Sequence, residues 1–271
     1  MILQNLHTHT VFDDGSDTHE AMLQAAVDLG FTALGFSYHS VLPFENDWAV
    51  QPENLPAYFE ALEAARRAFA DRIRVYSGIE WDVLSDPAGR EKLDYVIGSI
   101  HHITVGGAHY CIDESFERSK GILEDVFGGD PAAMSEAYFA QYERIAEDPE
   151  VDIVGHLDVV SKFCDGGDLL DVNAPYFTGP ALEAAKLLIA KDKIFELNTG
   201  AVCRGKKKDP YPSPLLLKEM NKLGARMTVS SDCHQRNLLN GCFAEAEELL
   251  KASGFTEVWE LTDAGFRPRP L

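Results

Sequence analysis

Six of the nine histidines in this chain follow short apolar runs, at points where β-strands would end. Neutral imidazole combined with carboxylate is the ligand set that hydrolytic metal centres use. Because such side chains recur at strand ends along the whole chain, packing explains them poorly. The nine candidate ligands are His7, His9, Asp14, His39, Glu80, His101, His156, Asp232 and His234. We therefore predict a metal-dependent hydrolase.

The first candidates lie close to the N-terminus. His7 and His9 alternate along an extended segment, so their side chains point to the same side of it. A His-x-His pair alone is structural or accidental about as often as functional. One of the three carboxylates in the next loop, Asp13, Asp14 and Asp17, is expected to complete this ligand set. We favour Asp14, which precedes a glycine and could turn back toward the pair, whereas Asp17 could instead cap the following helix.

A strand-end position decides the interpretation of His39 and Glu80. A lone histidine such as His39 is more often a hydrogen-bonded core residue than a ligand, but its place at the end of an apolar run shifts that balance. Glu80 also closes an apolar run, and burial of its carboxylate would be costly without a cation. A carboxylate at this position can bridge two metal ions.

Successive side chains of an extended chain point to opposite sides, and this indicates which residues can be ligands in two further segments. His101 and His102 are adjacent, so they point in opposite directions on an extended chain, and we choose His101 as the ligand and His102 as a substrate contact. Asp232 and His234 form an Asp-x-His pair that again faces one side. Nine ligands exceed the need of one ion and suit two or three closely spaced ions, an arrangement that supports phosphoryl transfer.

The elements that would position these residues alternate between strand-like and helix-like segments, which predicts βαβ units and a parallel sheet. The expected strands are 2–7, 33–37, 74–80, 95–100, 151–155, 194–198 and 226–231. The expected helices are 18–29, 53–70, 132–147, 180–191, 213–223 and 241–253. The candidate ligands follow the C-terminal ends of strands one to five and seven, the face on which barrel active sites are built. We predict an α/β fold in which residues 1–271 form a single domain, a distorted seven-stranded β/α barrel.

Three stretches are too irregular in sequence for short turns. They are 41–56, 103–131 and 163–179, and we expect them to be long loops that shape access to the site.

Composition limits the possible partners. The chain has 24 Lys and Arg against 44 Asp and Glu, a formal charge of −20 that makes a long nucleic-acid footprint improbable. An anionic small molecule remains possible, because divalent cations would reverse the local field. The N-terminus lacks the basic start of a signal peptide, and no apolar run approaches membrane-spanning length. Five scattered cysteines indicate a reducing cytoplasm and argue against a thiolate zinc site.

Together these motifs resemble those of the PHP superfamily, named for polymerase and histidinol phosphatase, over nearly the whole chain. More narrowly, the chain looks like the stand-alone histidinol-phosphate phosphatases. The matching motifs are His7-Thr8-His9, His39-Ser40, Glu80, the run from Asp94 to His101, Gly155-His156-Leu157-Asp158, the run from Glu196 to Gly200 followed by Arg204, Tyr211-Pro212-Ser213, and Ser231-Asp232-Cys233-His234 with the Gly-Cys-Phe-Ala-Glu-Ala helix after it.

The resemblance implies two or three divalent ions (zinc, manganese or iron) and hydrolysis of L-histidinol phosphate by a metal-bound hydroxide. Arg204, Asp232 and His234 would be the catalytic residues. Arg204, together with Lys162, would stabilise the non-bridging phosphate oxygens, and His102 would contact substrate. The chain departs from the family at two positions. Tyr38 stands where the family often has Asp, and Lys162 follows Ser161, where relatives often carry an arginine that would grip phosphate; lysine lacks its bidentate fork.

Three other functions stay open at this point. The first is a PHP phosphoesterase that acts on nucleotides, oligonucleotides or phosphotyrosine. The second is a non-catalytic, metal-binding regulatory protein, although such a protein would have no need of nine ligands. The third is an amidohydrolase-like C–N hydrolase, which usually shows a carboxylated lysine, and no strand end here offers one.

Overall fold

The computed structural model describes residues 1–167 and 169–271 and contains a parallel sheet of seven strands. The strands, in their order across the sheet, are β1 (Gln4–Asn5), β2 (Ala33–His39), β3 (Arg74–Asp82), β4 (Tyr95–Ser99), β7 (Ile153–Val154), β8 (Ile194–Asn198) and β9 (Arg226–Ser230). Each falls within or overlaps one of the seven predicted segments, so the strand prediction is confirmed. Their residues are almost all buried, as expected for parallel strands covered on both faces.

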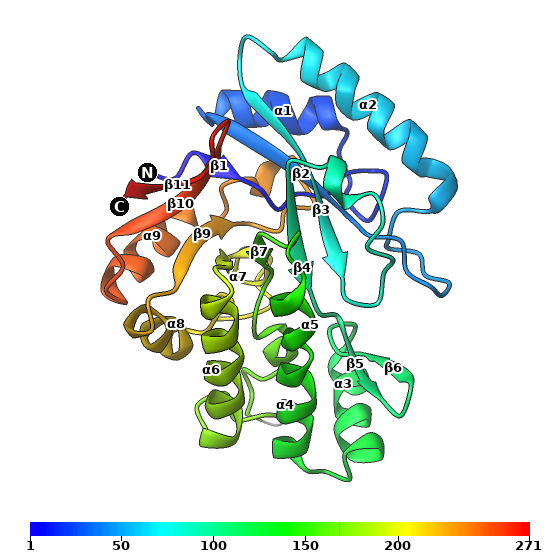
Figure 1. Cartoon of the computed structure of the whole chain (residues 1–271), viewed down its shortest axis with the longest axis vertical. Helices are drawn as coiled ribbons and strands as arrows, with labels where there is room; N and C mark the ends of the chain where they lie inside the picture. The colour runs from blue at the N-terminus through cyan, green and yellow to red at the C-terminus, as the bar shows by residue number, and fades with distance from the viewer. Residues whose placement is uncertain (168) are drawn as a thin grey trace.

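The two edges of this sheet approach each other and nearly close a barrel. Beyond the end of β1, Thr8 pairs in parallel with Cys233, which follows β9. The N–H of His9 donates to the Cys233 carbonyl at 2.9 Å, and the Cys233 N–H donates to the His7 carbonyl at 3.1 Å. The chain segments that carry the first and last candidate ligands are therefore joined directly at the C-terminal end of the barrel (Figure 1).

Helices surround the strands, as the sequence predicts. They are α1 (His19–Asp28), α2 (Leu55–Ala68), α3 (Phe116–Gly121), α4 (Pro131–Ala140), α5 (Tyr142–Glu147), α6 (Pro175–Ala190), α7 (Gly200–Cys203), α8 (Pro214–Lys222) and α9 (Phe243–Ala252). Short helical turns are η1 (Pro52–Asn54), η2 (Arg90–Lys92), η3 (Ile122–Val126, a π-helical turn), η4 (Val159–Ser161) and η5 (Arg236–Leu238).

Two helix predictions need correction. The segment predicted as one helix over 132–147 is divided into α4 and α5 at Gln141. The helix predicted to begin at 180 begins at Pro175, so Pro180 lies inside α6. Pro180 is the sixth residue of α6, so it lacks the N–H that would donate to the carbonyl of residue 176, and α6 continues past it.

The stretch 103–131, predicted as a long loop, is largely structured. It contains most of the hairpin of β5 (His102–Val105) and β6 (Ala108–Cys111), then α3 and η3. Gly106 and Gly107 both have positive φ, the conformation that a two-residue hairpin turn requires, so a Gly-Gly signal was present in the sequence. In the stretch 163–179, α6 already begins at residue 175, and position 168 lies outside the described residues. The stretch 41–56 forms a loop up to η1, as predicted.

A second hairpin covers the N-terminal end of the barrel and was not predicted. It is formed by β10 (Glu257–Thr262) and β11 (Gly265–Pro270). The side chains of Gln4 and Tyr76 donate hydrogen bonds to the Leu261 carbonyl at 2.9 and 3.0 Å, which attaches the hairpin to the barrel. Among the described residues, no helix is both long and apolar enough to cross a membrane.

Inside the barrel, the Tyr95 side chain occupies space that two glycines leave free. Its hydroxyl donates a hydrogen bond to the Leu6 carbonyl. A Cβ added at Gly78 would overlap the Tyr95 ring, and one added at Gly35 would overlap the Tyr95 hydroxyl. The absence of a side chain at these two strand positions is therefore a condition for filling the barrel with tyrosine.

Gly78→Ala is consequently expected to lower the free energy of unfolding by about 1–3 kcal/mol, the usual effect of overpacking a rigid core. Urea denaturation would measure the change. Gly179→Ala in α6 is the matched control, because a Cβ there meets no described atom within 4 Å and alanine favours a helix. A Gly78→Ala protein as stable as the parent would contradict this account of the barrel interior.

Candidate metal centre

The candidate ligands meet at the C-terminal end of the barrel. Three groups of side chains have potential ligand atoms within 4.8 Å of one another: His9 with Asp14, His39 and His234; His7 with His9 and Asp232; and His39 with Glu80 and His101. His156 joins them through Glu80, since its Nε2 lies 2.8 Å from Glu80 Oε1. All nine side chains predicted as ligands are thus brought together.

Glu80 lies at the centre of the arrangement. Its Oε2 is 3.1 Å from His7 Nε2 and 2.9 Å from His39 Nδ1. Its Oε1 is 3.3 Å from His101 Nε2 in addition to its contact with His156. The side chain of Glu80 is 1% exposed, so this carboxylate is surrounded by imidazoles on both of its oxygens. Such a position is suited to a carboxylate that bridges two ions.

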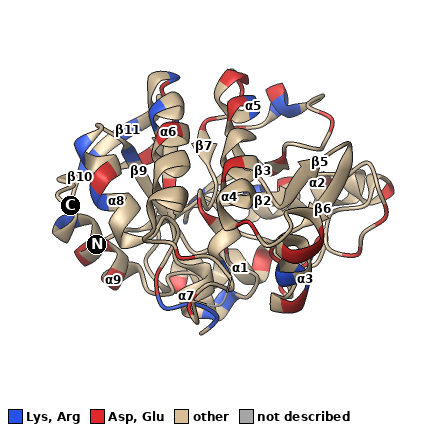
Figure 2. Ribbon diagram, turned by 90° about the horizontal axis from the view of Figure 1, so that it is seen from below, with Lys and Arg blue, Asp and Glu red and all other residues tan. Residues whose placement is uncertain are grey.

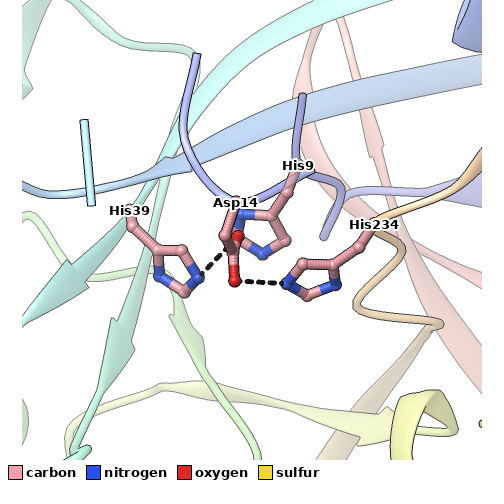
Figure 3. Close-up of side chains that lie close together, drawn as sticks. All are labelled: His9, Asp14, His39 and His234. Atoms are coloured by element: carbon pink, nitrogen blue, oxygen red, sulfur yellow. Dashed lines mark hydrogen bonds and ion pairs between the residues drawn. The ribbon is translucent and has the colours of Figure 1, made fainter. Parts of the chain in front are cut away.

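Figure 3 shows the first group, whose members Asp14 and His234 are partly exposed. Asp14 Oδ1 is 3.4 Å from His39 Nε2, and its Oδ2 is 3.1 Å from His234 Nε2. The imidazole of His9 packs against the rings of both His39 and His234, with centroids at 4.1 and 4.4 Å. Of the three carboxylates considered for this position, Asp14 is the one within the group.

The other two carboxylates of that loop, Asp13 and Asp17, accept hydrogen bonds and are not members of the group. Asp17 Oδ2 accepts the N–H of Arg236 at 2.8 Å, and the cap of α1 is Thr18, whose hydroxyl accepts the N–H of Ala21. The alternative that Asp17 caps the helix is therefore wrong: the residue next to the helix start is closer to its free N–H groups. Asp13 lies behind His9 and accepts from its Nδ1 at 2.8 Å.

Asp13 is one of three carboxylates that hold ligand imidazoles from behind, and sequence reasoning assigned none of them this role. Glu196 pairs with His7 Nδ1 at 2.9 Å, and Asp82 pairs with His101 Nδ1 at 3.0 Å. In each pair the carboxylate accepts from Nδ1, which leaves Nε2 directed to the centre. The sequence did contain signals, because Asp82 is two residues after Glu80 on the same side of β3, and Glu196 lies on β8 close to its C-terminal end.

Asp82→Asn tests the role of these carboxylates. The asparagine amide carries no negative charge to pair with His101 Nδ1. We therefore expect metal affinity to fall about 10- to 100-fold, the usual effect of losing a carboxylate that orients a ligand histidine. Titration of metal-free protein with Zn²⁺ or Mn²⁺ in a competing chelator would measure it. Asp86→Asn, an exposed neighbour outside the centre, is the control. Unchanged affinity would show that His101 needs no support from Asp82.

Several buried polar atoms at the centre form no hydrogen bond of acceptable geometry among the described residues, although some of them lie within ion-pair distance of one another. They are His7 Nε2, His9 Nε2, His39 Nδ1 and Glu80 Oε2. Unpaired buried polar atoms are costly, and here they converge on shared points rather than being scattered. Imidazole nitrogens and carboxylate oxygens are also the donors that zinc, manganese and iron accept. The residues present therefore fit divalent metal ions.

Opposite charges hold this arrangement together when no ion is bound. Burial opposes ionisation of Glu80, yet His7 and His39 hold its pKa well below the ordinary value. Burial likewise disfavours the charged form of His39, but Glu80 and Asp14 raise its pKa to about 10. His39 therefore carries a proton that a metal ion would have to displace.

A cavity of about 930 Å³ opens above the centre and contains the predicted substrate-binding residues. Arg204 follows α7, and its Nη1 donates to the Asp232 carbonyl at 2.7 Å, beside His234 Nδ1 at 3.3 Å. Lys162 also lines the cavity, but its Nζ donates to the Asp113 carbonyl at 2.7 Å. His102 lines it from the start of β5, and its Nδ1 is 3.9 Å from Asp82.

Tyr38, one of the two departures from the family pattern, faces away from the ligand groups. Its ring packs against those of Tyr58 and Phe59 at 4.7 and 5.9 Å. Burial raises the pKa of its hydroxyl to about 12. Tyr38 therefore packs in the layer between β2 and α2, and the substitution leaves the nine candidate ligands in place.

Known proteins share the sequence and the fold of this chain. The family model of the PHP domain matches residues 5–200. A probable histidinol-phosphatase of Deinococcus radiodurans is 28% identical over 258 residues, which are 92% of each chain. The histidinol-phosphatase of Lactococcus lactis subsp. lactis is 25% identical over 266 residues, 93% of this chain and 91% of that one.

Two solved structures have the same architecture. The histidinol phosphate phosphatase of Lactococcus lactis, complexed with zinc, L-histidinol and phosphate, superposes with a TM-score of 0.74 at 20% identity, over 97% of this chain and 98% of that one. A putative histidinol phosphatase of Listeria monocytogenes superposes with a TM-score of 0.76 at 18% identity, over 89% of this chain and 99% of that one. The predicted seven-stranded β/α barrel is thereby confirmed.

Proposed function

Because the chain belongs to the PHP domain family, we propose that it is a metal-dependent phosphomonoesterase that hydrolyses L-histidinol phosphate to L-histidinol and phosphate. The observation that carries the proposal is the position of Glu80 among five imidazoles, directly below a cavity that also contains Arg204. The relatives named histidinol-phosphatase, which align with more than nine-tenths of this chain, support the choice of substrate.

The nine candidate ligands would hold two or three divalent ions, as zinc, manganese or iron. Glu80 would be shared between ions, because its two oxygens face different histidines. Ions at these positions would neutralise phosphate oxygens and lower the pKa of bound water toward neutrality. Asp13, Asp82 and Glu196 would keep the imidazoles in the orientation and tautomer that a metal needs.

Arg204 would bind the phosphoryl group. Its guanidinium is fixed by the Asp232 carbonyl and lies next to His234, so a phosphate that reaches the ligand groups would meet a preorganised donor. Charged hydrogen bonds from arginine stabilise the growing charge on the phosphoryl oxygens. Asp232 and His234 would act together with Arg204, since the three residues adjoin. Lys162 would add a second positive charge near the substrate, held in place by the backbone carbonyl of residue Asp113.

Several narrower statements remain predictions. They are the organisation of residues 1–271 as one domain, a cytoplasmic location, and the absence of a nucleic-acid partner. In the view of Figure 2, Lys and Arg occur at several separate places along the ribbon, and the excess of 44 Asp and Glu over 24 Lys and Arg supports the last of these predictions.

The substrate proposal is tested by phosphate release from protein of measured metal content. Histidinol phosphate, p-nitrophenyl phosphate, its bis-ester, AMP and a phosphotyrosine peptide would be compared. We expect histidinol phosphate to have the highest kcat/KM by orders of magnitude. A higher value for the bis-ester, AMP or the peptide would favour another PHP phosphoesterase. No turnover of any ester by metal-loaded protein would favour a non-catalytic metal-binding protein.

Arg204→Ala is expected to raise KM for every phosphate monoester about 10- to 100-fold, which corresponds to the loss of a charge-assisted hydrogen bond. Arg204→Lys should recover part of the loss, because lysine keeps the charge but not the fork. Steady-state kinetics with metal analysis would measure both. Arg67→Ala, on the exposed surface of α2, is the control. Unchanged kinetics for Arg204→Ala would remove this residue from the site.

A further inference from the structure

The cavity extends beyond the part needed for a phosphoryl group. Its lining includes ligand residues and Arg204, and it also includes residues of two other segments that are distant in sequence. A cavity of about 930 Å³ lies in the range that encloses a whole small molecule. The alcohol part of a monoester therefore has a surface of its own to bind. We call this surface the leaving-group wall; it comprises Phe44, Glu45, Asp47, Trp48, Asp113 and Glu114.

Trp48 belongs to the leaving-group wall and lies beside two of the ligand imidazoles. Its ring centroid is 4.7 Å from that of His39, with the planes nearly perpendicular, and 5.5 Å from that of His101. Trp48 is partly exposed and lines the cavity. An aromatic surface therefore adjoins the ligand imidazoles, and the alcohol part of an ester bound at these ligands could contact this indole.

The loop that carries Trp48 is built to hold it. Asn46 Oδ1 accepts the N–H of Ala49 at 2.8 Å, and Asn46 Nδ2 donates to the Phe44 carbonyl at 3.1 Å. Gln51 Nε2 donates to the carbonyls of Asn46 and Ala49 at 3.2 and 3.0 Å. These bonds form a compact turn without help from a ligand. Trp48 is therefore preorganised, which reduces the entropy cost of using it for binding.

Asp113 provides a carboxylate on the other side of the leaving-group wall. Its Oδ1 accepts from Cys111 Sγ at 3.3 Å, whereas no described residue donates a hydrogen bond to its Oδ2. The cation nearest to Oδ2 is Lys162 Nζ at 3.6 Å, and Lys162 makes its shorter bond to the backbone carbonyl of Asp113. Although burial acts against the charged form, Lys162 and His101 lower the pKa of Asp113, so it is ionised at neutral pH. An ionised oxygen without a donor remains available to substrate.

We propose that Trp48 and Asp113 determine which phosphate monoesters this chain accepts, with Trp48 contacting a planar ring of the alcohol and Asp113 accepting a hydrogen bond from its ammonium group. The inference rests on the proposed phosphomonoesterase function and assigns its specificity to two residues. An alcohol whose ring carries a positive charge should bind most tightly, because an indole face attracts cations. The leaving-group wall also contains the acidic residues Glu45, Asp47 and Glu114. A neutral aryl ester would use Trp48 alone, and an aliphatic ammonium ester would use Asp113 alone.

The experiment compares Trp48→Leu and Asp113→Asn with the parent enzyme on four esters. Histidinol phosphate has a ring and an ammonium group, phenyl phosphate has only a ring, phosphoethanolamine has only an ammonium group, and glycerol 3-phosphate has neither. Metal content and circular dichroism would be measured for each protein. Phe59→Leu and Glu117→Gln are the matched controls, since both lie outside the cavity lining. Trp48→Phe is a milder variant in case Trp48→Leu fails to fold.

Asp113→Asn should raise KM about 10- to 100-fold for histidinol phosphate and phosphoethanolamine, and leave the values for phenyl phosphate and glycerol 3-phosphate unchanged. Trp48→Leu should raise KM about tenfold for histidinol phosphate and phenyl phosphate only. The affinity for the product L-histidinol, measured by calorimetry on metal-loaded protein, should fall in each variant by about the same factor as its KM for histidinol phosphate rises.

An equal loss on all four esters, or no loss on any, would overturn the inference, because the two residues would then serve the metal centre or nothing at all. Failure of the proposed function has a different signature. In that case the parent protein, with metals bound, would hydrolyse none of the four monoesters.

Discussion

Replacement of Glu80 by glutamine is expected to reduce kcat/KM for phosphate monoesters at least about a thousandfold, since bound metal supplies several kcal/mol of transition-state stabilisation and each ~1.4 kcal/mol changes a rate tenfold. Glu80 has ligand imidazoles against both of its oxygens, with His7, His39, His101 and His156 all within 3.3 Å. An amide in its place cannot bridge two cations as an anion, and it leaves the neighbouring positive charges unbalanced.

Two measurements separate the metal role of Glu80 from a general effect on folding. Metal content per chain should fall in Glu80→Gln, and circular dichroism should remain that of a β/α barrel. Glu53→Gln, on the exposed turn η1, is the control and should keep both metal and activity. A Glu80→Gln protein with full metal content and more than about a tenth of the parent kcat/KM would exclude Glu80 from a bridging position.

Removal of metal by a chelator is the second change with a large expected effect. Turnover should become undetectable, because Arg204 and Lys162 alone would bind phosphate without the charge neutralisation that two or three ions supply. The barrel should stay folded, since the ion pairs of Glu80 with His7 and His39 hold the centre in the absence of metal. Stoichiometric Zn²⁺, Mn²⁺ or Fe²⁺ should restore activity. Full activity in metal-free protein would refute the proposed function.

The recovery after chelation should depend strongly on pH. Glu80 and Asp14, acting against burial, raise the pKa of His39 to about 10, and the pKa values of His7 and His101 are raised well above the ordinary value. Below those pKa values the imidazoles are protonated in the metal-free protein, and a metal needs them neutral. Metal affinity should therefore rise with pH between 6 and 9, about tenfold per unit for each proton released. Calorimetry in buffers of different ionisation enthalpy would count the protons; a count of zero would contradict the ligand assignment.

The strands and most of the helices were predictable because their signals are local. A parallel strand buried on both faces appears in sequence as a short apolar run, and β2, β3 and β4 all have this form. The hairpin β10–β11 was missed, and its contacts show why. It is held by Gln4 and Tyr76, which lie far from it in sequence, and its exposed strand β11 contains arginine and proline rather than an apolar pattern.

In the candidate site, too, some residues could be predicted from local sequence signals and others depend on contacts between distant residues. Residue type and strand-end position were enough to name the candidate ligands, because the C-terminal ends of parallel strands must meet at one face of a barrel. The choice of Asp14 within the first group was a preference that only the contact with His234, 220 positions away, could support. The carboxylates behind the imidazoles were not assigned, since pairs such as His7 with Glu196 join residues 189 positions apart.

The amino-acid sequence was enough to predict the barrel and the set of side chains at the C-terminal ends of its strands, because periodicity and strand-end position are properties of neighbouring residues. How those side chains face one another depended on the folded structure. It decided that Glu80 is central, that Asp82 and Glu196 stand behind the ligands, and that Lys162 is turned toward Asp113. These are distances between atoms on different strands and loops, and they are set by closure of the barrel and by side-chain packing, which no local pattern contains.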